Sequence, residues 1–276
     1  MPFSKEMILG SSGNQGVADF YEYQIEQSVR MEFASNSYLR IAPGGLGTPT
    51  SLKKGTWSYW FKLHGRLGTE TTSSPEHVHF AAGTTGGAGG YMFYETVHHS
   101  TNYMKLNAGN MHNLDASYSD GRYGDPTAWY HQVIKFDSTQ STQSDRLIFY
   151  INGQQVSGFT TSNVSLNEDL IQWNVNNFII GAKQPAGHAV DGTDMYFAEF
   201  IWVDGTAYAP TQFGETKNGV WIPKDPTGTV FGNNGFHLKF QDASDLGNDS
   251  SGNNLDFAAN GLGTDHQVPD SPTFGE

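Results

Sequence analysis

The chain has 276 residues, and its 15 Lys and Arg residues against 28 Asp and Glu residues give a formal net charge of −13. This negative field repels nucleic acids and anionic membrane surfaces, so we expect neither as a partner. The absence of cysteine excludes disulfides, thiolate metal sites and a thiol nucleophile.

Residues 1–16 contain no apolar run that suits a signal peptide, and no stretch approaches the ~20 apolar residues of a membrane-spanning helix. We therefore expect synthesis in the cytoplasm without export. The 33 glycines and the short, turn-bounded apolar segments predict an all-β chain. We divide it into an N-terminal arm or linker (1–25), one β-sandwich (26–241) and a loop-rich C-terminal tail (242–276).

The first predicted strands alternate between apolar and polar residues. They cover Gln27–Phe33, Ser37–Ala42 and Thr56–His64. In the third strand, Trp57 and Phe61 share one side with other apolar residues, and Trp60 lies on the opposite side. We expect a core face and an outer face from this pattern.

The middle of the chain is predicted to hold three further strands, Glu76–Ala82, Tyr91–Val97 and Tyr103–Asn107. Alternation in the first of them predicts that Phe80 points into the core and that His79 points outward. His79 and Trp60 then face outward together if they belong to one sheet.

Two strands, Ala128–Asp137 and Asp145–Asn152, flank a polar loop, and Asn152–Gly153 predicts a tight turn. The segment Leu147–Ile151 is apolar on both faces, so both faces must be covered. Either another part of the chain or a neighbouring subunit provides that cover. From this strand and the aromatic N-terminal arm at Phe20–Ile25, we predict a homo-oligomer, either a trimer or a dimer.

The last predicted core strands are Asn176–Gly181, Asp194–Val203 and Phe236–Phe240. Four segments, Trp129–Val156, Thr56–Lys62, Asn177–Gly181 and Glu199–Asp204, resemble the laminin-G-like branch of the concanavalin A-like sandwich family. This resemblance implies an antiparallel β-sandwich of the jelly-roll type. Domains of this family usually bind rather than catalyse.

A narrower resemblance rests on two longer segments, SVRMEFASNSYLRIAP and AEFIWVDGTAYAPTQFGETKNGVWIPKD. Both are similar to structural proteins of marine tailed phages, in which such domains sit on tail fibres, tail tips or capsid surfaces. The resemblance implies a non-enzymatic virion protein with other virion proteins as partners and a host-surface glycan as ligand. The alternative is a cellular carbohydrate-binding module or a fragment of an adhesin.

Glycoside hydrolysis is a third possibility, because some sandwiches of this superfamily are glucanases. Those enzymes carry a Glu-x-Asp-x-x-Glu strand, and hydrolysis requires a pair of carboxylates at a set spacing. The sequence has no such motif, and Glu199 stands alone on its predicted strand. We therefore expect no enzymatic activity.

The candidate ligand-binding residues fall into two groups. Stacking on sugar rings requires exposed aromatic planes, and the candidates are Trp60, His79, Tyr94 and Tyr103; the alternative is that a loop or a subunit covers Trp60. Calcium, the one candidate cofactor, requires several oxygen ligands. Its candidates lie in one run, at Asp245, Asn248 and Asp249, and on a rim formed by Asp191 and Asp194, with a polar turn as the alternative.

Overall fold

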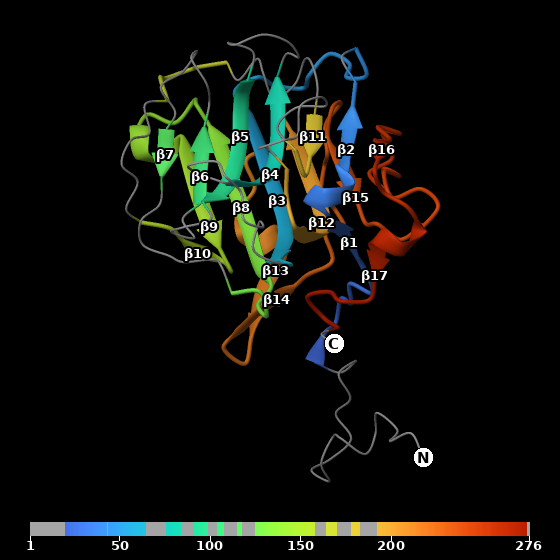
Figure 1. The fold of residues 1–276 in the computed structure, drawn as a ribbon. Coiled ribbons are helices and arrows are strands. Elements are labelled where there is room, and N and C mark those ends of the chain that lie inside the picture. The colour runs from blue at the N-terminus through green and yellow to red at the C-terminus, as the bar shows by residue number, and fades with distance from the viewer. Residues whose placement is uncertain are drawn as a thin grey trace, which may run out of the picture.

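The computed structural model describes residues 20–42, 44–64, 76–83, 91–98, 104–107, 115–117, 125–157, 164–169, 178–182 and 192–274. Two antiparallel sheets stacked face to face make up the molecule (Figure 1). Within the described residues, no helix has the length and apolar character needed to cross a membrane. The predicted all-β sandwich is confirmed.

The first sheet has eight strands in the order β10-β9-β8-β3-β12-β1-β17, and β15 also pairs with β12. Its strands are β1 (Ser28–Met31), β3 (Lys54–Leu63), β8 (Tyr130–Asp137), β9 (Leu147–Ile151), β10 (Gln154–Gln155), β12 (Met195–Asp204), β15 (Phe236–Leu238) and β17 (Gln267–Val268).

The second sheet has seven strands in the order β16-β2-β11-β4-β5-β6-β7. Its strands are β2 (Tyr38–Ile41), β4 (Glu76–Gly83), β5 (Tyr91–His98), β6 (Met104–Asn107), β7 (Asp115–Ser117), β11 (Phe178–Ile180) and β16 (Ala258–Asn260). A separate hairpin joins β13 (Gly214–Lys217) to β14 (Val220–Pro223). The described residues also include short 3-10 turns at Phe33–Ser35, Gln143–Asp145, Pro210–Gln212 and Thr264–His266.

One aromatic core fills the space between the sheets. Trp57 is fully buried at its centre, where its ring stacks on Phe80 at 4.3 Å and packs against Trp202 at 4.6 Å. Phe61 and Phe149 belong to this same cluster. Strand alternation therefore predicts the inner face of β3 correctly, since alternate residues of a strand project to opposite faces.

The outer face of the first sheet is covered by the chain itself. The N-terminal segment brings Tyr23 and Ile25 onto Trp60, and the β13–β14 hairpin brings Trp221 there. Tyr150 of β9 packs into a neighbouring apolar cluster with Phe213. The outer face of Leu147–Ile151 is therefore covered by another part of the same chain, which is the first of the two predicted alternatives. This strand gives no argument for a neighbouring subunit.

The Asn152–Gly153 turn lets the hairpin approach the sheet closely. Both residues have positive φ angles, of 49° and 76°, as the predicted tight turn requires. A Cβ atom on Gly153 would lie 2.4 Å from the ring of Trp221. Glycine at this position therefore provides the turn and also the space for the tryptophan that covers the sheet.

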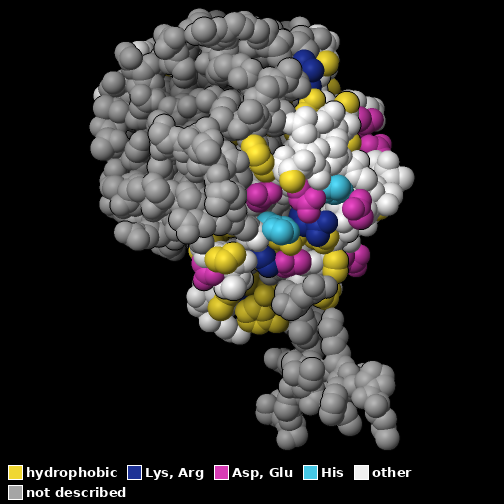
Figure 2. Space-filling model, viewed as in Figure 1, with side chains coloured by type: hydrophobic (Ala, Val, Ile, Leu, Met, Phe, Trp, Pro, Cys, Tyr) yellow, Lys and Arg dark blue, Asp and Glu magenta, His cyan; other side chains and the backbone are white. Residues whose placement is uncertain are grey.

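The segment predicted as a C-terminal tail is part of the sandwich. Its strand β16 pairs with β2, and β17 pairs with β1 at the edge of the first sheet. His266, beside β17, lies 3.7 Å from Glu32, and Figure 2 shows charged and histidine side chains gathered on this side of the molecule. The boundary predicted after residue 241 is wrong, because backbone hydrogen bonds of both sheets cross it.

Candidate functional site

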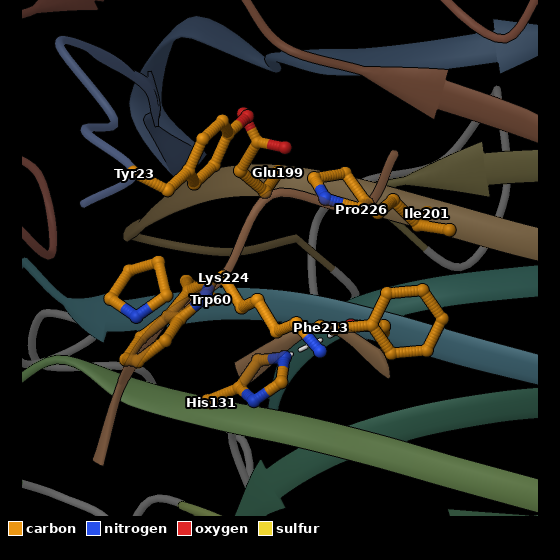
Figure 3. A pocket seen from close by; sticks show the side chains of 10 residues that line it. Tyr23, Trp60, His131, Glu199, Ile201, Phe213, Lys224 and Pro226 are labelled. Carbon is orange, nitrogen blue, oxygen red and sulfur yellow. Dashed lines mark hydrogen bonds between the residues drawn. The ribbon is translucent and has the colours of Figure 1, made fainter. Parts of the chain in front are cut away.

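A small cavity lies beneath the covering segments on the outer face of the first sheet (Figure 3). Its volume of about 10 Å³ leaves room for about one water molecule. The polar residues around it come from the N-terminal segment, the first sheet and the residues after the hairpin; they are Tyr23, Ser58, His131, Glu199 and Lys224. Trp60 closes one wall.

Glu199 owes its position to a β-bulge in β12. The pairing with β3 shifts between Ala198 and Ile201, which inserts one extra residue on the β12 side. Glu199 has a φ angle of 49°, an uncommon conformation for a residue other than glycine. Bulges re-aim side chains, and this one directs a carboxylate onto the outer face of the sheet, where it is only 6% exposed.

Two other side chains contact the Glu199 carboxylate. The ring of His237 on β15 places Nε2 2.5 Å from Glu199 Oε2. The Tyr23 hydroxyl also hydrogen-bonds to Glu199, and Figure 3 shows the two groups pointing toward each other. Burial, followed by the negative charge of Glu199, raises the pKa of Tyr23 far above its usual range. Tyr23 is therefore a fixed hydrogen-bond donor that ties the N-terminal segment to the sheet.

A second polar chain crosses the cavity floor from Trp221 through His131 to Ser58. Trp221 Nε1–H can only donate, and it lies 2.9 Å from His131 Nδ1. Burial lowers the pKa of His131 to about 3, so the ring is neutral and its proton resides on Nε2. That proton is donated to Ser58 Oγ, 2.9 Å away.

This tautomer opposes nucleophilic catalysis. A serine nucleophile needs a base that accepts its proton, whereas His131 already donates to Ser58. A glycosidase would need a second carboxylate with a sugar ring bound beside the pair. The nearby Asp225 instead accepts hydrogen bonds from Thr227, and the cavity is too small for a sugar. The hydrogen bonds of the cluster therefore hold the covering segments against the sheet.

The predicted sugar-stacking pair of Trp60 and His79 is wrong. Trp60 is 4% exposed and stacks on His131 at 4.6 Å, beneath cover from its own chain. His79 is fully buried between the sheets, where it shares a hydrogen bond of 2.9 Å with the Tyr59 hydroxyl. The strand pairing shifts between Val78 and Phe80, so this bulge turns His79 inward instead of outward.

The side chains of the two tyrosine candidates lie outside the described residues. Tyr94 lies in β5, where its backbone pairs with Ala81 of β4 and Asn107 of β6, and its side chain lies outside the described residues. Tyr103 also lies outside them. Sugar contact by these tyrosines stays a prediction.

The calcium candidates form a tightly hydrogen-bonded turn. Asp249 Oδ1 accepts the backbone N–H groups of His237 and Ser251, and Oδ2 accepts from Ser251 and Leu255. With four donors from the protein, this carboxylate suits a structural turn better than a cation. Among the described residues, Asn248 and Asp245 contribute only backbone hydrogen bonds to the turn, with Asn248 N–H donating to the Asp245 carbonyl.

The second calcium candidate is divided. Asp194 Oδ1 accepts the backbone N–H of Phe33 at 2.8 Å, and Asp191 lies outside the described residues. No group of three or more His, Asp or Glu side chains in the described part of the chain could hold a metal ion. Calcium binding stays a prediction, with Asp249 and Asp194 already engaged by the protein.

Sequence reasoning missed the roles of Tyr23, Glu199 and His237. A bulge leaves no reliable mark in a single sequence, and Glu199 is the extra residue of one. Its two side-chain partners are also distant in the sequence. Tyr23 lies 176 positions before Glu199, and His237 lies 38 positions after it. The isolated carboxylate within an apolar strand was the one available signal.

Comparisons with known proteins show the fold and no family. No family model matches the sequence, and no curated protein matches it. Among solved structures, a putative carbohydrate binding protein from Bacteroides ovatus is similar, with a TM-score of 0.53 and 12% identity. The match covers 87% of this chain and 59% of that protein, so the chain spans about three fifths of its length.

Two further matches are weaker. A heptameric SAP-like pentraxin from Limulus polyphemus has a TM-score of 0.46 and 16% identity, over 69% of this chain and 81% of that one. Trypanosoma rangeli sialidase has a TM-score of 0.40 and 12% identity, over 58% of this chain and 22% of that one. The likeness to the Bacteroides ovatus protein agrees with the antiparallel β-sandwich fold and extends no further.

Proposed function

We propose that this chain is a non-catalytic carbohydrate-binding sandwich. The observation that supports this function best is the likeness of 87% of the chain to a putative carbohydrate binding protein of the same architecture. The sealed cluster around Glu199 supports the non-catalytic part, because His131 donates to Ser58 and the cavity admits no sugar. Its polar groups serve folding, which leaves loops and edges for ligand contact.

The finer proposal places the protein on the virion of a tailed phage, on a tail fibre or as a capsid decoration, with a host glycan as ligand. Its support is the resemblance of the segments at 28–43 and 198–225 to structural proteins of such phages. We also propose a dimer or trimer in contact with other virion proteins. Symmetry is usual for such appendages.

A cellular carbohydrate-binding module or adhesin fragment is the second candidate. The Bacteroides ovatus protein favours it, since that source is a cellular organism. The genes that flank the coding sequence separate the two proposals. Tail or capsid genes on either side support the virion protein, whereas genes for polysaccharide uptake support the cellular module.

A glycan array probed with the fluorescently labelled full chain tests carbohydrate binding. We expect retention on a defined subset of glycans and competition by the same free glycan. Release of reducing sugar from any bound glycan would contradict the non-catalytic assignment. Sedimentation that shows only a ~30 kDa species at micromolar concentration would contradict the proposed oligomer.

A further inference from the structure

An open groove of about 620 Å³ lies beside the end of β15. This volume falls within the range of pockets that hold small ligands, about 300–1,000 Å³. Three separate segments form its walls: the residues after β15, the turn around Asp249, and β17. Its polar lining consists of Lys239, Gln241, Asp242, Asn248, Ser250 and Gln267.

The backbone around the groove is fixed by hydrogen bonds. Leu238 forms a β-bridge with Asp249, and the Ser250 N–H donates to the His237 carbonyl at 2.8 Å. Gln267 Nε2 reaches across from β17 to the Phe240 carbonyl at 2.7 Å. The walls therefore hold their spacing without a ligand, which lowers the entropy lost when a ligand binds.

Phe240 carries an unusual conformation at the groove. Its φ angle is 57°, a genuine outlier for a bulky side chain. The conformation buries the Phe240 ring in the main core and turns Gln241 and Asp242 out into solvent. Such strain concentrates at sites where function depends on the conformation, and here it shapes the groove rim.

The side chains at the rim are available to a ligand. Across the part of the chain that the structure describes, Lys239, Gln241, Asn248 and Ser250 make no side-chain hydrogen bond and no ion pair. Gln241, Asn248 and Ser250 are exposed. This contrasts with Asp249 between two of them, whose carboxylate accepts four hydrogen bonds.

The chemistry of the lining favours a neutral polyhydroxyl ligand. Lys239 and Asp242 bring one charge of each sign, and hydrogen bonds from Ser244 lower the pKa of Asp242, which keeps that carboxylate ionised. Amide and hydroxyl groups supply donors and acceptors together, as pairs of sugar hydroxyls require. An acidic glycan would meet the repulsion of a chain with net charge −13.

We propose that this groove is a binding site for a neutral glycan, with Gln241 and Asn248 as its main hydrogen-bonding side chains. The inference rests on the proposed carbohydrate-binding function and assigns it a place. The site lies at the β17 end of the first sheet, and β10 lies at the opposite end (Figure 1).

The test uses the full chain, a panel of neutral oligosaccharides of glucose, galactose, mannose and N-acetylglucosamine, and the double variant Gln241→Ala/Asn248→Ala. The control is Gln155→Ala, which removes an exposed glutamine from β10. We expect the double variant to bind about thirtyfold more weakly, since the two lost hydrogen bonds contribute about 1 kcal/mol each and about 1.4 kcal/mol is tenfold in affinity. The control should bind normally. Thermal unfolding verifies that each variant is folded.

Side-chain amide signals in nuclear magnetic resonance spectra provide a second readout. The NH2 signals of Gln241 and Asn248 are assigned by their loss in the single variants, and both should shift when the bound oligosaccharide is added. The groove is not the binding site if the double variant binds as tightly as the unmodified chain and the two amide signals of the unmodified chain do not shift. The proposed carbohydrate function would then still stand. An unmodified chain that binds no glycan of either the array or the panel would overturn both.

Discussion

The outer-face cluster around Glu199 and the groove beside β15 use similar polar side chains in opposite ways. In the cluster, Glu199, His131 and Ser58 each have a partner from another segment, and the enclosed cavity measures about 10 Å³. In the groove, Gln241 and Asn248 have no side-chain partner within the described residues, and the open volume is about 620 Å³.

The difference separates polar groups that serve folding from those available for binding. Buried polar groups must be paired, because an unmade hydrogen bond costs more than a formed one contributes. The cluster obeys this rule and so stabilises the cover over the sheet. Exposed polar groups are paired with water, which a ligand displaces at modest cost. Substitutions should therefore affect stability in the cluster and affinity in the groove.

Trp60→Ala should give the largest effect. The substitution removes the ring that stacks on His131 and carries the N-terminal segment, leaving a large cavity under the cover. We expect a loss of about 3–5 kcal/mol in the free energy of unfolding, measured by denaturant titration. Trp60→Phe, which keeps an aromatic ring, should lose less. Equal stability of Trp60→Ala and the unmodified protein would show that the cover does not depend on this ring.

Glu199→Ala should be the next most damaging change. It leaves His237 and the Tyr23 hydroxyl without their shared acceptor in a buried site. Each orphaned group costs at least about 1 kcal/mol, so we expect a loss of about 2 kcal/mol or more in the free energy of unfolding. Glu199→Gln keeps an acceptor oxygen and serves as the matched control, with a smaller loss. If both variants lose the same amount, the negative charge rather than the hydrogen bonds stabilises the cluster.

Acid should destabilise the fold through its buried histidines. Burial lowers the pKa of His131 from 6.5 to about 3 and lowers that of His79 as well. The unfolded chain thus takes up protons that the folded protein excludes, so the stability present above about pH 6.5 is lost as the pH falls toward 3. We expect a loss of about 1.4 kcal/mol per pH unit for each of the two histidines.

Denaturant titrations between pH 6.5 and 5 measure this slope. Carboxylates have pKa values of about 4, so they stay ionised in this range and contribute little to the slope. His131→Asn is the informative variant. It should be less stable at neutral pH for reasons of packing, yet its acid slope should be smaller by the share of one histidine. A slope unchanged by the substitution would mean that His131 is protonated in the folded protein.

The sequence predicted those parts of this comparison that depend on alternation. The inner face of β3, with Trp57 and Phe61, and the Asn152–Gly153 turn follow from period-two patterning and from turn chemistry. The prediction that His79 points outward is wrong, because a bulge adds one residue to β4 and interrupts the alternation of its side chains. Covers are equally hard to predict, since Tyr23 and Trp221 reach Trp60 from distant parts of the chain.

The groove was partly visible in the sequence. The oxygen-rich run after residue 241 indicates either a calcium loop or a polar turn. In the structure, the Asp249 carboxylate accepts hydrogen bonds within the turn, whereas the Asn248 side chain is exposed. Composition cannot distinguish these two neighbouring residues. The strained backbone of Phe240 also has no signature in sequence, because aromatic residues rarely adopt a positive φ.

Asn248→Ala should have the smallest effect on folding. Its side chain is exposed and makes no hydrogen bond or ion pair with a described residue, so we expect a change within about 0.5 kcal/mol in the free energy of unfolding. The adjacent Asp249→Ala is the matched contrast, because it removes the acceptor of four hydrogen bonds and should cost about 2 kcal/mol or more. Two similar losses would mean that Asn248 belongs to the structural turn, and the groove would then lack one of its two main ligand contacts. If Asn248→Ala leaves the stability unchanged and Asp249→Ala lowers it, the two adjacent residues serve different purposes: Asp249 stabilises the turn, and Asn248 is available to a ligand.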